Sequence, residues 1–81
     1  MKLNEMIQSV NDNQKIRVLL TYDVISDGFA YKFKGWKDDV IKAIKEAEKE
    51  YEENLMDSDV EFIRASIIDN TNYIVIVGMI K

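Results

Sequence analysis

The chain has 81 residues, of which 47% are hydrophobic and 32% are charged, and its formal net charge is −4. This length leaves room for one small domain, residues 1–81, and the composition is typical of a folded globular chain rather than a disordered one. Cysteine is absent, which excludes disulfides and thiolate chemistry and fits a cytoplasmic location, and histidine is absent too, which removes the commonest general base and metal ligand.

The N-terminal segment is expected to form a short amphipathic helix over about residues 2–10. Its apolar residues have the spacing of one helical face: Leu3, Met6, Ile7 and Val10. A helix this short must dock on other elements to be stable. Because the segment is amphipathic, it does not predict a signal peptide, and the longest apolar run, Tyr73–Ile80, is too short to cross a membrane.

Residues 15–25 and 29–33 alternate between apolar and polar side chains, as two strands of a hairpin do. Asp27-Gly28 between them is a two-residue turn signal, since glycine adopts positive φ without a steric penalty. This turn implies three cross-strand pairs: Val24 with Tyr31, Tyr22 with Phe33, and Asp23 with Lys32. Two apolar pairs on one face and one ion pair on the other therefore predict this register.

A long helix is predicted over Trp36–Met56. Its apolar residues recur every three or four positions and form one stripe: Trp36, Val40, Ile44, Ala47, Tyr51 and Leu55. Asp38 and Asp39 stand at its start, where carboxylates favour the positive end of the helix dipole. The stripe is expected to pack across one face of a sheet.

A second hairpin is predicted from Asp59–Ile68 and Tyr73–Ile80, joined by residues 69–72, with Ile68 opposite Tyr73. The second strand is apolar on both faces, so it is expected to be a central strand or to lie under a partner. Gly78 within it indicates a bulge or a close approach of another backbone.

The predicted fold is α+β in the order α-β-β-α-β-β, a four-stranded antiparallel sheet of two hairpins with the long helix on one face. The other sheet face would carry apolar and basic side chains together: Leu19, Ile25, Ile68, Tyr73, Val75 and Val77, beside Arg17, Lys32, Lys34 and Arg64. We expect the N-terminal helix to cover part of this face. The alternative is an exposed patch that mediates association.

Acidic residues are concentrated between Glu46 and Glu61. Eight acids and one base, Lys49, give this segment a net charge of −7. Several of the acids crowd the C-terminal end of the predicted helix, where the dipole disfavours them by about 0.3–1 kcal/mol each. They either form a solvated face that keeps the protein in solution or steer the chain onto a basic partner.

Other site chemistry finds little support. Asp57-x-Asp59-x-Glu61 has the opening spacing of a calcium loop, but Phe62 and Ile68 stand where the loop needs glycine and glutamate. No phosphate-binding glycine loop is present, serine and threonine nucleophiles lack a histidine base, and no carboxylate pair forms a recognisable site. No metal, cofactor or catalytic residue is therefore predicted, and the chain is expected not to be an enzyme. A small basic cluster of Lys32, Lys34 and Lys37 lies near Phe33 and Trp36, but both aromatics are assigned to the core.

In its size, its lack of catalytic residues and its acidic run Glu46–Glu61, the chain resembles the small anti-defence proteins of phages. These include anti-CRISPR and anti-restriction inhibitors, some of which are DNA mimics that present carboxylates where a target expects phosphates. The resemblance implies an acidic inhibitor or adaptor that binds a basic protein, one that itself binds nucleic acid. The candidate docking residues, taken from the acidic run, are Glu46, Glu50, Glu53, Asp57 and Asp59.

Two alternatives remain at this point. One is a homodimer formed through the exposed sheet face or a strand edge, with the acids serving only solubility. The other is nucleic-acid binding through Lys32, Lys34 and Lys37. The second opposes the overall charge of a chain with a pI near 4.7, so direct nucleic-acid binding is not expected.

Overall fold

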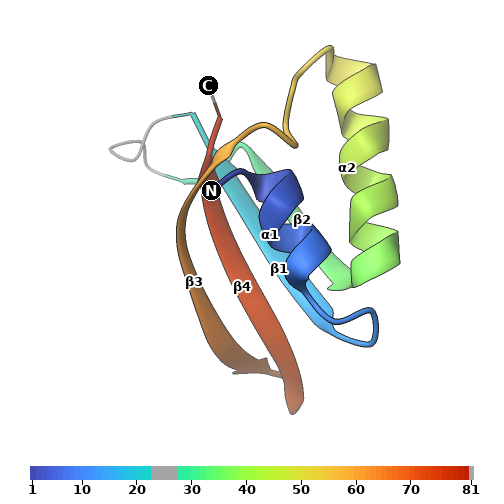
Figure 1. Ribbon diagram of the computed structural model, residues 1–81, viewed down its shortest axis with the longest axis vertical. Coiled ribbons are helices and arrows are strands. Elements are labelled where there is room, and N and C mark those ends of the chain that lie inside the picture. Colours follow the sequence, from blue (N-terminus) through green and yellow to red (C-terminus); the bar gives the residue numbers. More distant parts are fainter. Residues whose placement is uncertain (23–27, 81) are drawn as a thin grey trace.

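The computed structural model describes residues 1–22 and 28–80, which form two helices and one four-stranded sheet (Figure 1). The elements are α1 (Leu3–Ser9), β1 (Lys15–Thr21), β2 (Tyr31–Trp36), α2 (Lys37–Tyr51), β3 (Asp59–Ile68) and β4 (Thr71–Met79). The predicted α+β class and the order α-β-β-α-β-β are therefore confirmed. No helix in the described part of the chain is both long and apolar enough to cross a membrane.

The strands lie in the order β2-β1-β4-β3, with antiparallel pairs at both edges and a parallel pair, β1 with β4, in the centre. The prediction of a fully antiparallel sheet is wrong, and the sheet is mixed. Each hairpin turn fixes the direction of its own two strands, but apolar alternation does not fix how one hairpin docks beside the other. The prediction that the last strand is central is confirmed, since β4 lies between β1 and β3.

The register predicted for the first hairpin is wrong. Tyr31 pairs with Leu20, where the two-residue turn would pair it with Val24, and Lys32 pairs with Leu19 where Asp23 was predicted. The strands end at Thr21 and begin again at Tyr31, so the connection is longer than two residues. The predicted turn residue Asp27, like Asp23, lies outside the described residues. The shift is four residues, an even number, so the paired residues of β1 and β2 stay on their predicted faces, whereas Val24 and Ile25 lie outside the described residues.

The second hairpin closes on a tighter turn than predicted. Ile68 pairs with Thr71 rather than with Tyr73, and the two turn residues, Asp69 and Asn70, have φ angles of 50° and 63°. Two consecutive positive φ angles are typical of a type I′ turn, which matches the twist of the flanking strands. The register again slips by an even number, two residues, and a bulge between Val60 and Phe62 adds one residue to β3.

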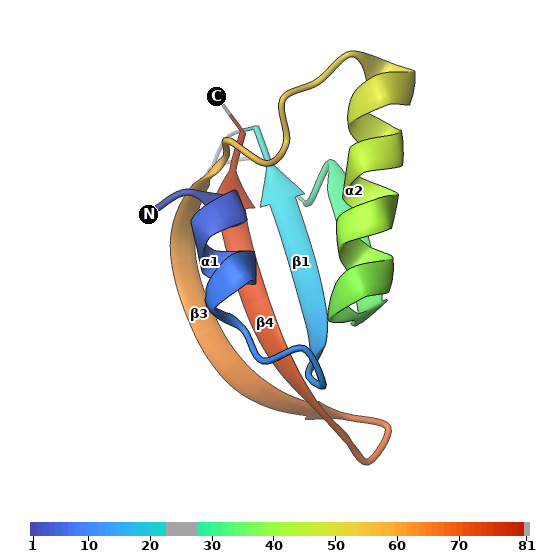
Figure 2. The same cartoon turned by 45° about the vertical axis from the view of Figure 1, so that its right-hand side comes forward.

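Both helices lie on the same face of the sheet (Figure 2). The core between them and the sheet is made of fully or nearly fully buried aliphatic residues: Leu3, Ile7, Val10, Ile16, Val18, Leu20, Val40, Ile44, Leu55, Ile76 and Ile80. The expectation that the N-terminal helix covers the opposite face is therefore wrong. The apolar stripe of α1 packs into the same core as that of α2, and no helix of the described residues covers the opposite face, here called the open face.

Helix α2 ends five residues before the predicted boundary at Met56. The chain leaves the helix at Glu52, which has left-handed φ and ψ angles of 54° and 41° and donates its N–H to the Glu48 carbonyl. Leu55 still reaches the core, but from the loop that follows the helix. Trp36 and Tyr51, predicted for the buried stripe, are instead 50% and 58% exposed, because Trp36 belongs to β2 and Tyr51 is the last helical residue.

Candidate functional site

Two of the five predicted docking residues, Glu46 and Glu50, lie one turn apart on α2 and are exposed. Neither forms an ion pair within residues 1–22 and 28–80. The helix surface around them is not purely acidic, since Lys42, Lys45 and Lys49 line a shallow hollow together with Glu46. These two carboxylates thus belong to a surface of mixed charge.

Glu53 follows α2 and accepts a hydrogen bond of 2.6 Å from the Tyr22 hydroxyl at the end of β1. The carboxylate favours the protonated phenol, so this bond raises the pKa of Tyr22 well above its ordinary value near 10. Glu53 is therefore engaged in linking the end of α2 to the end of β1.

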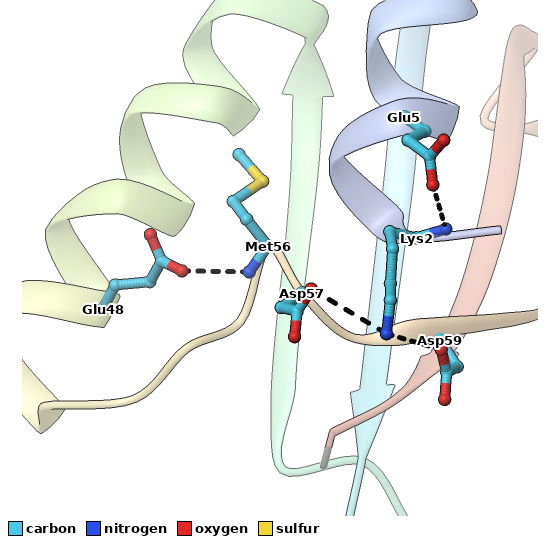
Figure 3. A network of polar contacts seen from close by, with 6 residues as sticks. All are labelled: Lys2, Glu5, Glu48, Met56, Asp57 and Asp59. Carbon is cyan, nitrogen blue, oxygen red and sulfur yellow. Dashed lines mark hydrogen bonds and ion pairs between the residues drawn. The ribbon is translucent and has the colours of Figure 1, made fainter.

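Asp57 and Asp59 lie beside α1 rather than beside α2 (Figure 3). The Nζ atom of Lys2 stands 3.1 Å from a carboxylate oxygen of Asp59 and 3.8 Å from one of Asp57. Glu48 also turns inward, and its carboxylate accepts a 2.9 Å hydrogen bond from the backbone N–H of Met56. These contacts tie the start of β3 to the N-terminus and to α2.

The five predicted docking residues therefore fall into separate groups and do not gather on one face. Glu46 and Glu50 are free of ion pairs in the described part of the chain, Glu53 holds Tyr22, and Asp57 with Asp59 faces Lys2. A docking role for this set stays a prediction.

The three lysines of the predicted basic cluster also separate. Lys37 is 5% exposed, and its Nζ atom donates to the Val10 carbonyl at 2.8 Å and to an Asp12 carboxylate oxygen at 3.0 Å. It fixes the loop after α1 against the start of α2. Lys32 and Lys34 point from β2 to the open face instead, where other cations join them.

The open face carries five cations, one or two from each of three strands. The registers place Lys34 beside Arg17, Arg17 beside Val75, and Val75 beside Arg64, in one row across all four strands. The next row on one side contains Lys32, Leu19, Val77 and Phe62, and the row on the other contains Trp36, Lys15, Tyr73 and Ser66. Sequence alternation predicted most of this face, but it missed Lys15 and Trp36.

The residues at the centre of the open face are apolar and almost fully buried. Leu19, Val75 and Val77 form a second small core cluster with exposures of 8%, 4% and 6%. Long basic side chains can lay their methylene stems over such residues while their charges stay in water. In agreement, Lys15 Nζ lies 4.9 Å from the Trp36 ring centroid and Lys34 Nζ lies 5.8 Å from that of Tyr73.

These cations keep their charge available. Within residues 1–22 and 28–80 none of Lys15, Arg17, Lys32, Lys34 and Arg64 forms an ion pair. Accessible aromatic rings stand at both ends of the face, since Trp36 is 50% exposed and Phe62 is 51% exposed. Phe62 also lines a hollow with Thr21, Phe29, Glu61 and Val77. Chemically, the face can bind an extended polyanion and stack planar groups.

The calcium-type spacing brings no ligand cluster together. The part of the chain that the structure describes contains no group of three or more acidic side chains placed to hold a metal ion. Comparisons of the chain with models of known protein families, with curated protein sequences and with solved structures found no match.

Proposed function

We propose that this chain is a non-enzymatic binding protein whose open face binds single-stranded nucleic acid. The observation that carries the proposal is the grouping of five cations on one uncovered sheet face, without acidic partners among the described residues. Basic side chains contact phosphates, and exposed rings stack on unpaired bases. Trp36 and Phe62 are half-exposed and lie on the two edge strands of the face, which supports stacking of unpaired bases on both rings.

The negative net charge does not exclude this function, because the charges are segregated. Most of the acids lie on α2 and on the loop after it, and the cations lie on the opposite side of the sheet from α2. At physiological ionic strength, charges further apart than about 8 Å are largely screened from each other in solvent. A ligand on the open face therefore responds mainly to the local positive charge.

Single strands fit this face better than a duplex does. Stacking on Trp36 and Phe62 requires bases that are free to leave their helix, whereas a paired base is not available. Within residues 1–22 and 28–80, no helix lies on the open face that could enter a duplex groove. We therefore expect the protein to bind single-stranded nucleic acid with higher affinity than a duplex.

The direct test measures the fluorescence anisotropy of a labelled single-stranded oligonucleotide. Lys32→Glu/Lys34→Glu alters the open face, and Lys42→Glu/Lys45→Glu makes the same charge change on α2 as a matched control. The wild type and the control should bind, and the open-face variant should lose at least about tenfold in affinity at low salt. Equal losses in both variants, or no binding by the wild type, would overturn the proposal.

Salt dependence and the single tryptophan give two further readouts. If all five cations contact phosphates, the log–log slope of affinity against salt should be about −3.5. Trp36 is the only tryptophan, so stacking should quench the intrinsic fluorescence with an oligonucleotide and not with inorganic polyphosphate. A polyglutamate peptide that competes as well as the oligonucleotide would show instead that the face binds an acidic protein segment.

A second candidate function is the acidic inhibitor or adaptor that docks on a basic protein. Glu46 and Glu50 favour it, because both are exposed and neither has an ion pair within residues 1–22 and 28–80. A pulldown from a host lysate at low and high salt tests it, with Glu46→Lys/Glu50→Lys as the variant. A partner that the variant retains at low salt would contradict docking through these carboxylates.

A further inference from the structure

The outer edge of β3 is covered at its start and bare beyond. The Leu3 N–H donates to the Ser58 carbonyl at 2.8 Å, and the Val60 N–H donates to the Met1 carbonyl at 2.9 Å, so the N-terminus pairs with the chain as far as Val60. From Glu61 to Ile68, no backbone partner among the described residues lies on this side. Figures 1 and 2 both show β3 as the outer strand, with no element along its outer side.

The two edges of the sheet differ in how they are protected. The opposite edge, β2, is short and carries Lys32 and Lys34, and charged residues on a short edge strand disfavour pairing with another chain. The bare part of β3 carries one cation, Arg64, and exposes apolar side chains on both faces. Phe62, Ile63 and Ile67 are 51%, 42% and 72% exposed.

Along the bare segment, backbone N–H and C=O groups point alternately toward β4 and outward, and the turn fixes which residues point which way. Ile68 and Thr71 flank a two-residue turn, so they are expected to exchange backbone hydrogen bonds with each other. Residues at even positions then direct their N–H and C=O groups toward β4, and Ile63, Ala65 and Ile67 direct theirs outward. A second strand that pairs here must place its own outward-directed residues opposite these three.

We infer that the occupant of this edge is a second copy of the chain, paired antiparallel about a two-fold axis through Ala65. In this register Ile63 faces Ile67 of the second copy on the helix side, and Phe62 faces Ile68 of the second copy on the open face. Arg64 faces the uncharged Ser66 of the second copy. Every exposed apolar side chain of the bare segment thereby gains an apolar neighbour, which stabilises an antiparallel pair.

Neighbouring registers are worse for electrostatic reasons. A two-fold axis through Arg64 sets the two arginines directly opposite each other, and like charges in that position are destabilising. An axis through Ser66 sets Ile63 against Asp69, an apolar residue against a charged turn residue. The register with the two-fold axis through Ala65 is therefore favoured. Its one pair of like charges is Glu61 opposite Asp69 of the second copy, at the outer ends of the paired strands.

The pairing joins two four-stranded sheets into one of eight strands and leaves both open faces on the same side. This inference goes beyond the proposed function and does not depend on it, since the edge pairs whether or not the open face binds nucleic acid. It also predicts the sign of the salt effect. Screening of Glu61 against Asp69 should leave dimerisation unchanged or strengthened by salt.

Sedimentation equilibrium over micromolar to millimolar protein concentration tests the inference. The wild type should form a dimer, and Ile67→Lys should shift its dissociation constant upward by at least about tenfold by placing a charge in the apolar pair. Asn54→Lys adds the same charge on the exposed loop before β3 and should leave the dimer unchanged. A wild type that stays monomeric throughout, or a dimer that Ile67→Lys does not weaken, would overturn the inference.

A cysteine cross-link reports the register itself, because the natural chain contains no cysteine. In the inferred dimer, Ala65→Cys places two thiols opposite each other, at about the 5.5 Å Cα separation that suits a disulfide. Lys32→Cys, on the opposite edge, is the control for random collisions. The Ala65→Cys protein should oxidise to a covalent dimer much faster than the control, and equal rates would contradict the register.

Discussion

Lys37 holds the loop between α1 and β1 against the start of α2. Its ammonium group is buried and has two acceptors, the Val10 carbonyl and the Asp12 carboxylate, so the charge is both solvated by the backbone and paired. Asp12 is itself exposed, with 84% of its side chain accessible, which makes the carbonyl contact the more protected of the two. Lys37 thus belongs to the architecture of the helix side and not to a binding surface.

Replacing this lysine with methionine keeps the apolar stem and removes both hydrogen bonds. Because the Val10 carbonyl then loses a buried donor, we expect Lys37→Met to lower the free energy of unfolding by about 1–3 kcal/mol. Lys42→Met on the exposed side of the same helix is the control and should change it by less than about 0.5 kcal/mol. Urea denaturation measures both, and equal effects would show that the Lys37 contacts do not stabilise the fold.

Tyr22 gives a second prediction at the level of a single residue. The raised pKa of its hydroxyl means that the hydrogen bond to Glu53 contributes stability below the unfolded pKa near 10 and loses it as pH rises through the folded value. Tyr22 should therefore ionise after an unperturbed tyrosine does. Titration followed by NMR of the tyrosine rings measures this, with Tyr22→Phe to assign the signal. Glu53→Gln should lower the pKa of Tyr22, and no change would contradict the bond.

At the scale of the strands, Gly78 lets β4 pass close to its neighbours. A Cβ atom at this position would stand 3.0 Å from a Leu20 methyl carbon and 3.2 Å from the Asp59 carbonyl oxygen. The site lies opposite Val60, beside the bulge of β3. The glycine identified from the sequence thus marks a close approach between β4, β1 and β3, as predicted.

An alanine at this position should therefore be strained. We expect Gly78→Ala to destabilise the fold by about 1–3 kcal/mol through overpacking. Leu20→Val removes the methyl carbon that clashes, so the double variant should be less destabilised than the sum of the two single changes. Thermal or urea unfolding of the four proteins gives this coupling energy. Strict additivity would place the strain elsewhere, at the Asp59 backbone.

The sheet face on which each strand side chain lies could be predicted from the sequence, whereas the register of the strands and the relative direction of the two hairpins could not. An alternation of period two survives any even slip, so Arg17, Lys32 and Arg64 were correctly placed together although both hairpin registers were wrong. The parallel contact between β1 and β4 depends on packing between distant segments, which no local pattern encodes. Lys37 is buried and Trp36 is exposed because β2 ends at Trp36 and α2 begins at Lys37. Packing between distant segments sets this boundary too, so the sequence pattern did not predict it.

At the scale of the whole molecule, charge is divided between two sides of one sheet. The helix side carries the acidic excess, part of which binds Lys2, Tyr22 and the Met56 backbone. The open face carries five cations that form no ion pair within residues 1–22 and 28–80. A chain with this division can be acidic overall and still attract a polyanion to one face. The proposed pairing of β3 would double that face, with its five cations and with Glu61, which lines the hollow beside Phe62.

This combination predicts how affinity depends on oligonucleotide length. If one strand can reach both open faces of a dimer, the second contact becomes intramolecular, and affinity should rise by about 10²-fold or more once the oligonucleotide spans both. Ile67→Lys should abolish this excess while leaving the affinity for a short oligonucleotide unchanged, because the variant alters the edge and not the open face. Anisotropy titrations with a series of lengths measure the effect. A steep rise that persists in Ile67→Lys would mean that two monomers bind side by side without the β3 pair, and a gradual rise in both proteins would mean that each face acts alone.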